Sequence, residues 1–372
     1  MKKVLFISFE YPAGKSYCGG VGQIVKQSRE AMLDLGYEPY VLITSEFKKK
    51  HPVKLLLCDN TILHYPNFWS FQKEYDWHKF NYIIQHFVNW TQELRKIKNC
   101  KGRRPKIIYH FHSILRRERD SGFRTLNRFL FNQEKMIEIA DKIICPSRYE
   151  YDNFIRYFPS FLDKVVLIEN TLETFPFNRL TARDIRKKFE IKENDIVSLY
   201  VGRLERIKGA ETVIKYMPEI LKKHRNLKFF MVGKVLERDL YRKLRRVQEK
   251  FPHQFFYIRY LEKEKLFQYY YLCDIYVNTS LSESFSLSTH ESALCNSALL
   301  LNWLPVFDKF KDAAAFFSNH DSNGNGFLSR YEHLIKNKRL RDKLSRNANR
   351  IARNCLLNNN LRSDITKLFS QF

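Results

Sequence analysis

The stretch IVSLYVGRLERIKG, residues 196–209, decides how the rest of the chain is interpreted. It opens with a continuous apolar run, Ile196 to Val201, which is typical of a strand buried on both faces of a parallel sheet. A helical pattern follows from Glu211 to Lys223. A strand, a short loop and a helix in this order predict one unit of an α/β fold with a parallel sheet.

The loop inside this stretch carries two cations between two glycines. Gly202 and Gly209 bracket Arg203 and Lys208, and the loop follows the carboxyl end of the predicted strand. Ligands of doubly wound sheets bind beyond that end. An arginine fork and a mobile lysine suit a diphosphate, whose negative charge grows as it leaves. We therefore interpret Arg203 and Lys208 as a diphosphate site, with a solvated basic loop as the alternative.

The same alternation of strands and helices extends in both directions from this stretch. Before it, helices are predicted near 21–35 and after Ser147, and after it at 238–250 and 328–353. Strands are predicted at 4–9, 40–43, 107–109, 142–145, 165–168, 229–232, 255–258, 275–278 and 299–301. The pattern is interrupted between Asn170 and Thr181, where Pro176 and the lack of periodicity indicate a linker. The sequence therefore predicts two Rossmann-like domains facing across a cleft.

Length and composition agree with two folded domains. The chain has 372 residues, of which 44% are hydrophobic and 28% charged. No apolar run approaches the roughly 20 residues of a membrane-spanning helix, and residues 4–9 are too few for a signal peptide. The seven cysteines form no Cys-x-x-Cys pair, which argues against zinc fingers and a disulfide framework and favours a reducing, cytoplasmic location.

The net charge of +25 favours a polyanionic partner. From Lys48 to Lys106 there are 13 Lys and Arg against 4 Asp and Glu, a balance of 13 − 4 = +9, interleaved with aromatic residues such as Trp69 and Trp77. This mixture suits the edge of an anionic membrane, so we expect a peripheral location on its cytoplasmic face. A solvated basic surface without a partner is equally compatible with the charge. No RRM, KH or helix-turn-helix pattern supports a nucleic-acid partner.

Two carboxylates stand eight residues apart in the segment ESFSLSTHE, residues 283–291. Glu283 falls in a loop before a predicted helix and Glu291 about one turn inside it. A carboxylate accepts hydrogen bonds from neighbouring sugar hydroxyls, so both suit sugar recognition. Two capping or surface acids are the structural alternative.

Two further sites follow predicted strands of the first half. His110 and His112 flank Phe111 and share one face in extended geometry, but no third ligand stands at metal spacing, so no metal is expected. Gly19 and Gly20 open the first helix, where glycines let the backbone approach a phosphate. A tight turn would require the same glycines.

Taken in order, these motifs resemble the GT-B retaining glycosyltransferases of family 4, and more distantly the glycogen synthases. The resemblance runs from the first strand to about Cys355. It is most specific at residues 201–209, at Met231-Val-Gly-Lys234 and at residues 283–291.

The resemblance implies a role for each matching position. Gly19, Gly20 and Gly202 would approach the donor diphosphate, which Arg203 and Lys208 would bind. Glu283, with Phe285 and Ser286 beside it, would hold the donor sugar, and Glu291 the ribose. His112 matches the active-site histidine of the first domain best, with His110 as second choice. Ser284 and Ser286 replace glycines that the family often has, and these bulkier residues would narrow the phosphate pocket.

The implied protein is a hexosyltransferase that needs neither metal nor cofactor. It would move a sugar from a nucleotide-diphosphate sugar to a glycan or lipid-linked acceptor, as in polysaccharide or lipopolysaccharide synthesis. The implied domains are an acceptor domain at 1–172, a donor domain at 173–355 and a helix at 356–372 that packs back on the first domain. Two alternatives stay open, a non-catalytic binding protein docked on a membrane or polyanion and a nucleotide-sugar epimerase of the same fold.

Overall fold

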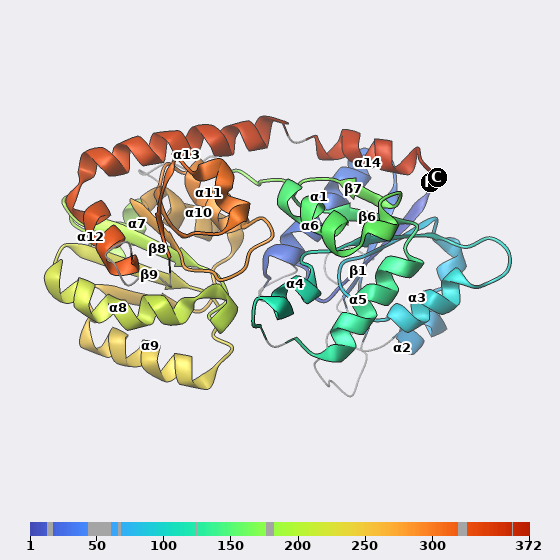
Figure 1. Ribbon diagram of the computed structural model, residues 1–372, viewed down its shortest axis with the longest axis horizontal. Coiled ribbons are helices and arrows are strands. Elements are labelled where there is room, and N and C mark those ends of the chain that lie inside the picture. The colour runs from blue at the N-terminus through green and yellow to red at the C-terminus, as the bar shows by residue number, and fades with distance from the viewer. Residues whose placement is uncertain are drawn as a thin grey trace. The chain divides into compact units, whose positions relative to one another are not determined.

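The computed structural model describes residues 1–12, 18–43, 61–65, 68–123, 125–175, 182–318, 326–358 and 360–372. The chain forms two compact units, Met1–Thr171 with Asn359–Phe372, and Leu172–Asn358. Each unit contains one sheet with helices around it, as the labels of Figure 1 show. The two units are described separately below.

The first unit is built on a seven-stranded parallel sheet in the order β3-β2-β1-β4-β5-β6-β7. The strands are β1 (Lys3–Ser8), β2 (Glu38–Ile43), β3 (Ile62–His64), β4 (Tyr82–Gln85), β5 (Lys106–His110), β6 (Lys142–Cys145) and β7 (Val165–Leu167). The α-helices are α1 (Gly20–Asp34), α2 (Phe68–Glu74), α3 (Thr91–Lys98), α4 (Leu115–Asp120), α5 (Asn127–Ile139), α6 (Arg148–Tyr157) and α14 (Leu361–Phe369). Both faces of the sheet are buried, because Leu5 and Ile7 of β1 belong to one hydrophobic cluster and Val4 and Phe6 to another.

The second unit is built on a six-stranded parallel sheet in the order β10-β9-β8-β11-β12-β13. The strands are β8 (Ile196–Val201), β9 (Leu227–Val232), β10 (Phe255–Ile258), β11 (Ile275–Asn278), β12 (Ala298–Asn302) and β13 (Ala314–Phe317). The α-helices are α7 (Arg183–Lys188), α8 (Ala210–Lys223), α9 (Arg238–Lys250), α10 (Lys263–Leu272), α11 (Leu287–Leu294), α12 (Phe327–Lys336) and α13 (Lys338–Asn358). Because β8 pairs with β11, the loops that follow these two strands meet at one edge of the sheet.

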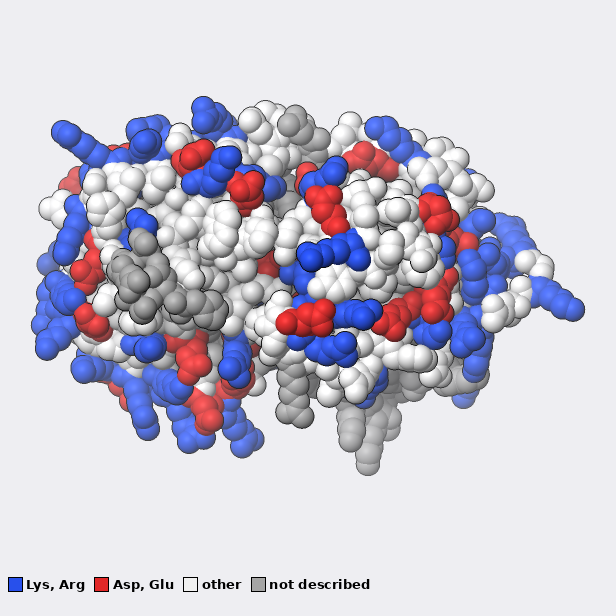
Figure 2. All heavy atoms as spheres, viewed as in Figure 1, with Lys and Arg blue, Asp and Glu red and all other residues white. Residues whose placement is uncertain are grey.

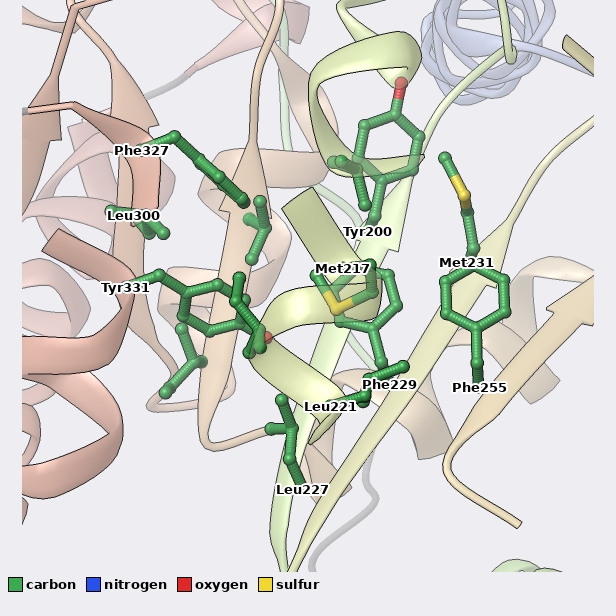
Figure 3. Close-up of a cluster of buried hydrophobic side chains, with 14 of the residues drawn as sticks. Tyr200, Met217, Leu221, Leu227, Phe229, Met231, Phe255, Leu300, Phe327 and Tyr331 are labelled. Atoms are coloured by element: carbon green, nitrogen blue, oxygen red, sulfur yellow. The ribbon is translucent and has the colours of Figure 1, made fainter. Parts of the chain in front are cut away.

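One face of the second sheet packs on a core of large apolar side chains. Met217 and Leu221 of α8 lie against Phe229 of β9, and Tyr331 of α12 closes the far side of this cluster (Figure 3). These four side chains are fully buried. The packing holds β8, β9 and α8 as a rigid base under the loop of residues 202–209.

The structure confirms the predicted fold class of two Rossmann-like parallel sheets. It also corrects details of the predicted elements. The helix expected over residues 328–353 is two helices, because the Asn337 side chain accepts a hydrogen bond from the Leu340 N–H at 2.9 Å and starts α13 anew. The strands β3, β4 and β13 were not predicted. Two of them, β3 and β4, lie within the basic aromatic stretch from Lys48 to Lys106, which the sequence analysis interpreted as a membrane edge.

The described aromatic side chains between Lys48 and Lys106 pack in or against the core of the first unit, whereas the sequence analysis placed them at a membrane edge. Tyr65, Phe71, Phe80 and Tyr82 are buried in the core of the first unit. Tyr75, Trp77, Phe87 and Trp90 pack against that core. Residues 48–60 and the side chains of Phe68 and Trp69 lie outside the described part of the chain. Within the described residues, no helix is both long and apolar enough to span a bilayer.

Much of the positive charge of the second unit lies on exposed helix surfaces. Figure 2 shows Lys and Arg gathered over α8 and α9, at the lower left of the view. Several of these cations have acidic partners: Arg242 pairs with Asp239 at 2.7 Å and Lys243 with Glu211 at 2.5 Å. Exposed pairs of this kind contribute little to stability but keep the helix face solvated.

The last helix, α14, packs on the first unit. Ile365 and Leu368 are buried in the same cluster as Val25 and Met32 of α1. The Phe369 ring stacks on Tyr82 of β4, with 4.0 Å between ring centroids. This helix therefore completes the hydrophobic layer on the α1 face of the first sheet.

A buried ion pair lies behind the carboxyl edge of the first sheet. Glu150 of α6 is fully buried and its Oε1 accepts from Arg117 Nη2 of α4 at 2.6 Å. Its Oε2 has no hydrogen-bond partner within the described residues. Burial raises the pKa of Glu150 to about 7, against the opposing effect of Arg117.

The pKa of Glu150 predicts how stability depends on pH. A carboxyl whose pKa is higher in the folded state favours folding when protonated, so its contribution is complete below about pH 4.5 and is lost as the pH rises through about 7. We expect Glu150→Gln to remove this dependence, with the stability difference between variant and wild type changing by roughly 1–3 kcal/mol between pH 4.5 and 8. Thermal melting of both proteins across this range measures it. A stability difference between the two proteins that stays constant from pH 4.5 to 8 would contradict the prediction.

Candidate active site

The candidate site of the second unit begins where the loop after β8 meets the loop after β11. Gly209 has a left-handed φ of +64°, and a Cβ at this position would lie 1.8 Å from the carbonyl oxygen of Thr279. Thr279 Oγ1 donates to the Gly209 carbonyl at 2.8 Å, and the Leu281 N–H donates to the Ile207 carbonyl at 2.8 Å. Only glycine permits this approach, and the contact fixes the residue before it, Lys208, beside the second loop.

Lys208 and Glu283, predicted from separate motifs, form an ion pair. Lys208 Nζ lies 2.9 Å from Glu283 Oε1, and the two side chains are 22% and 10% exposed. Ser280 Oγ donates to the same carboxylate oxygen at 2.7 Å. Partial burial strengthens the attraction, and the serine reduces the freedom of the carboxylate. The cation predicted to bind a diphosphate and the acid predicted to bind sugar hydroxyls therefore lie within hydrogen-bonding distance of each other.

Arg203 lies on the same loop as Lys208 but has a different partner. Its Nη2 is 3.0 Å from Glu205 Oε1, and the arginine side chain is 46% exposed. An exposed pair of this kind is weak, so the guanidinium can exchange Glu205 for a more strongly charged anion. The structure thus brings Lys208 to Glu283 and leaves Arg203 on Glu205.

Helix α11 begins beside this ion pair with its N-terminal N–H groups uncapped. Its N-cap residue, Ser286, is left-handed with φ +65°, and its side chain does not cap a backbone N–H of the helix. Instead its Oγ accepts from Asn278 Nδ2 at 3.1 Å and bonds Thr289 Oγ1 at 2.8 Å. These bonds explain how serine is tolerated where the resembling family often has glycine. The uncapped helix start, with its partial positive charge, is suited to an anion.

Phe285, which the resemblance places beside the donor sugar, is buried in the second unit. Its buried ring stacks on His290, with centroids 4.3 Å apart and planes at 4°, and Lys309 Nζ lies 5.3 Å from the ring centroid. Burial lowers the pKa of His290 to about 3, so this histidine is neutral. The stack fixes the loop that carries Glu283.

Glu291 is buried and paired with a residue that sequence reasoning missed. Its Oε1 forms an ion pair with Nζ of Lys263, the first residue of α10, and Glu291 is 2% exposed. A buried carboxylate needs such a partner to stay ionised. Lys263 therefore holds the position and charge of the acid expected at the ribose.

The glycines of the first unit serve an internal carboxylate. The N–H groups of Gly19 and Gly22 each donate to the side chain of Glu10 at 3.0 Å. A Cβ at Gly19 would lie 2.9 Å from Glu10 Oε1. The Glu10 carboxylate thus occupies the space around Gly19 and Gly20 where the sequence predicted a phosphate of the nucleotide sugar. It also accepts hydrogen bonds from the backbone N–H groups of Gly19 and Gly22. A phosphate would need Glu10 to move or would use other donors.

Three histidines gather where β4 and β5 end. His86 follows β4, while His110 ends β5 and His112 lies two residues beyond. Their ring centroids are 4.8 to 5.3 Å apart, and His86 Nδ1 lies 3.1 Å from His112 Nε2. Burial, and then the neighbouring imidazoles, lower the pKa of His86 and His110 well below its usual value, and burial lowers that of His112 to about 3.

The residues that sequence reasoning missed share one feature, their position in the chain. Glu10, His86 and Lys263 each lie within a few residues of the carboxyl end of a strand, where ligands of parallel sheets bind. His86 was hidden because β4 itself was not predicted. Within the described residues, no group of three or more His, Cys, Asp or Glu is arranged to hold a metal ion.

Family models match both units of the chain. The model described as Glycosyl transferases group 1 matches residues 181–350, and the model described as Glycosyltransferase Family 4 matches residues 18–174. The first contains the Lys208–Glu283 pair and the second the three histidines.

Related sequences and solved structures point the same way. An alpha-monoglucosyldiacylglycerol synthase of Acholeplasma laidlawii is 20% identical over 85% of this chain and 83% of its own. A subunit of phosphatidylinositol N-acetylglucosaminyltransferase of Saccharomyces cerevisiae is 22% identical over 78% of this chain and 66% of its own.

Among solved structures, sucrose-phosphate synthase of Thermosynechococcus elongatus superposes with a TM-score of 0.77 at 16% identity, covering 100% of this chain and 99% of its own. The HepE protein of Anabaena, in complex with UDP and glucose, superposes at 0.74 and 16% identity over 100% of both chains. Given the matches to both family models, this chain belongs to the group 1, family 4 glycosyltransferases of the GT-B fold.

Proposed function

We propose that this glycosyltransferase is a retaining, metal-independent hexosyltransferase that moves a sugar from a nucleotide-diphosphate sugar to a glycan or lipid-linked acceptor. The observation that carries the proposal is the 2.9 Å contact between Lys208 and Glu283. One group binds the leaving diphosphate and the other the hydroxyls of the sugar, and these are the two halves of a nucleotide-sugar donor. The UDP of the similar HepE structure makes UDP-sugars the first donors to test.

The leaving group is stabilised by positive charge from three sources. Lys208 exchanges Glu283 for a phosphate oxygen, the uncapped start of α11 supplies N–H groups, and Arg203 exchanges Glu205 for the second phosphate. Because the donor brings two negative charges to the loop, both exchanges replace a carboxylate partner with a stronger anion. These contacts supply the charge stabilisation that a metal ion provides in other transferases, and no further cofactor is invoked.

The transfer itself occurs on one face of the sugar. The bond from the anomeric carbon to the diphosphate oxygen breaks, and the acceptor hydroxyl forms a bond to that carbon from the same side. The proton of the hydroxyl passes to the departing phosphate oxygen, so no carboxylate pair is needed as acid and nucleophile, in contrast to glycosidases. Glu283 holds the sugar hydroxyls during this step.

The nucleotide is held at its ribose by Glu291. This carboxylate accepts hydrogen bonds from the ribose hydroxyls while Lys263 balances its charge and orients it. The acceptor is proposed to be lipid-linked on two grounds. The names of two relatives describe transfer to lipids, and the net charge of +25 attracts an anionic membrane surface.

The role of Lys208 predicts a loss of turnover. Lys208→Ala should lower kcat for transfer by about 100-fold or more, since the developing charge on the diphosphate loses its closest cation. Transfer from UDP-glucose and related donors is followed by product analysis, which also separates transfer from epimerisation. Lys222→Ala, on the exposed face of α8, makes the same charge change away from the site and should leave kcat unaltered. Equal effects of the two substitutions, with unchanged melting temperatures, would contradict the proposal.

The Lys263–Glu291 pair predicts the affinity for the nucleotide. Lys263→Gln should raise the Kd for UDP by roughly tenfold, because the buried carboxylate loses its counter-charge and no longer presents a fixed acceptor to the ribose. Binding of UDP and of 2′-deoxy-UDP is compared by calorimetry. The variant should discriminate less between the two nucleotides than the wild type does. Unchanged discrimination would place the ribose elsewhere.

Membrane association is tested separately from catalysis. The protein should sediment with vesicles that contain anionic lipid at low salt and bind neutral vesicles weakly, and added salt should weaken the binding by screening. Equal binding to both kinds of vesicle would remove the membrane from the proposal without affecting transfer to a soluble acceptor.

A further inference from the structure

The contacts among the three histidines of the first unit indicate which of their ring nitrogens carry protons. His86 and His110 are 1% and 5% exposed, and the Nε2 atoms of both are buried without a hydrogen-bond partner in the described part of the chain. The His112 side chain is more exposed than these two, although it too is largely enclosed by the protein. Its Nε2 is engaged with His86 Nδ1, which leaves Nδ1 as the ring nitrogen available to a ligand.

The protonation state of the three rings limits how the protons can be arranged. All three imidazoles are neutral near pH 7, because burial lowers each pKa. Each ring therefore carries one proton, on either Nδ1 or Nε2. A second proton on any ring would place an uncompensated cation among two other imidazoles.

The unpartnered nitrogen of His86 decides between the two tautomers. A proton on His86 Nε2 would be a buried N–H without an acceptor, which is rarer in proteins than a buried acceptor without a donor. The proton is therefore on His86 Nδ1, which donates to His112 Nε2 across 3.1 Å. His112 must then carry its own proton on Nδ1.

We propose that His86 is a positioning residue that holds His112 in the Nδ1–H tautomer, so that His112 presents a neutral hydrogen-bond donor to an oxygen of the sugar being transferred. The inference rests on the proposed function, because it assigns a chemical role in the same transfer reaction. As a neutral donor, His112 steadies a hydroxyl or the ring oxygen and does not remove the acceptor proton. That proton passes to the leaving phosphate.

The packing around the pair supports this role. His86 is held by its own backbone, since its N–H donates to the Ile7 carbonyl at 2.9 Å, and its ring lies 5.9 Å from the ring of Phe6. The His110 ring covers both partners, at 4.8 Å from His86 and 4.9 Å from His112. The His86 ring is thus fixed by two neighbouring strands, as a residue that orients another side chain should be.

The test combines a tautomer measurement with kinetics. In protein labelled with ¹⁵N-histidine, long-range ¹H–¹⁵N spectra distinguish a protonated from a bare ring nitrogen, and the His112→Gln variant identifies the His112 signals. We expect a protonated Nδ1 and a bare Nε2 on His112 of the wild type. In His86→Leu this preference should be lost, and kcat should fall by roughly tenfold with little change in the donor KM.

The variant His86→Asn controls for packing. The Asn side-chain amide can occupy the position of Nδ1 and donate to His112 Nε2, so it should restore the tautomer and most of the kcat, while leucine should not. A wild-type His112 protonated on Nε2, or a tautomer unaffected by His86→Leu in a folded protein, would overturn the inference. Because the spectra need no substrate, failure of the proposed transfer reaction would appear as missing turnover with the tautomer result intact.

Discussion

The close approach of two backbone segments at Gly209 and Thr279 is the constraint on which the candidate donor site depends. The absence of a side chain at Gly209 lets its backbone lie against the Thr279 carbonyl, and the threonine hydroxyl then bonds back to the Gly209 carbonyl. Lys208 is next to this contact in sequence. The contact therefore places the Lys208 ammonium beside the loop that carries Glu283, where the two side chains form an ion pair.

This constraint depends in turn on the order of strands in the second sheet. β8 pairs with β11, so the loops that leave their carboxyl ends are adjacent although about 70 residues separate them in the chain. The apolar packing beneath, with Met217 and Phe229 at its centre, keeps the two strands in register. The first unit uses the same geometry, because β4 and β5 are neighbours and bring His86 to His112.

In each unit, polar groups near the carboxyl ends of the strands are paired within the chain. Lys208 is paired with Glu283, Lys263 with Glu291, and the N–H groups of Gly19 and Gly22 with Glu10. Such pairs keep partly buried charges compensated and orient them before a ligand arrives. In the proposed complex, the diphosphate replaces Glu283 as the partner of Lys208 and the sugar hydroxyls become the partners of Glu283, while the Lys263–Glu291 pair stays in place.

The sequence by itself determined the fold class and the chemical character of the site. Apolar runs such as Ile196–Val201 and the helices between them require only local patterning, so two parallel sheets and most of their elements could be predicted, as could the cations and acids at strand ends. Only the tertiary structure decided which of these groups meet. A local pattern does not distinguish aromatic residues buried in a core from aromatic residues at a surface, so the stretch around β4 was interpreted as a membrane edge, and both β4 and His86 were missed. Likewise, the ion pair between Lys263 and Glu291, 28 positions apart in the sequence, could not be predicted, because strand order and helix packing, which are long-range properties, set the distance between them.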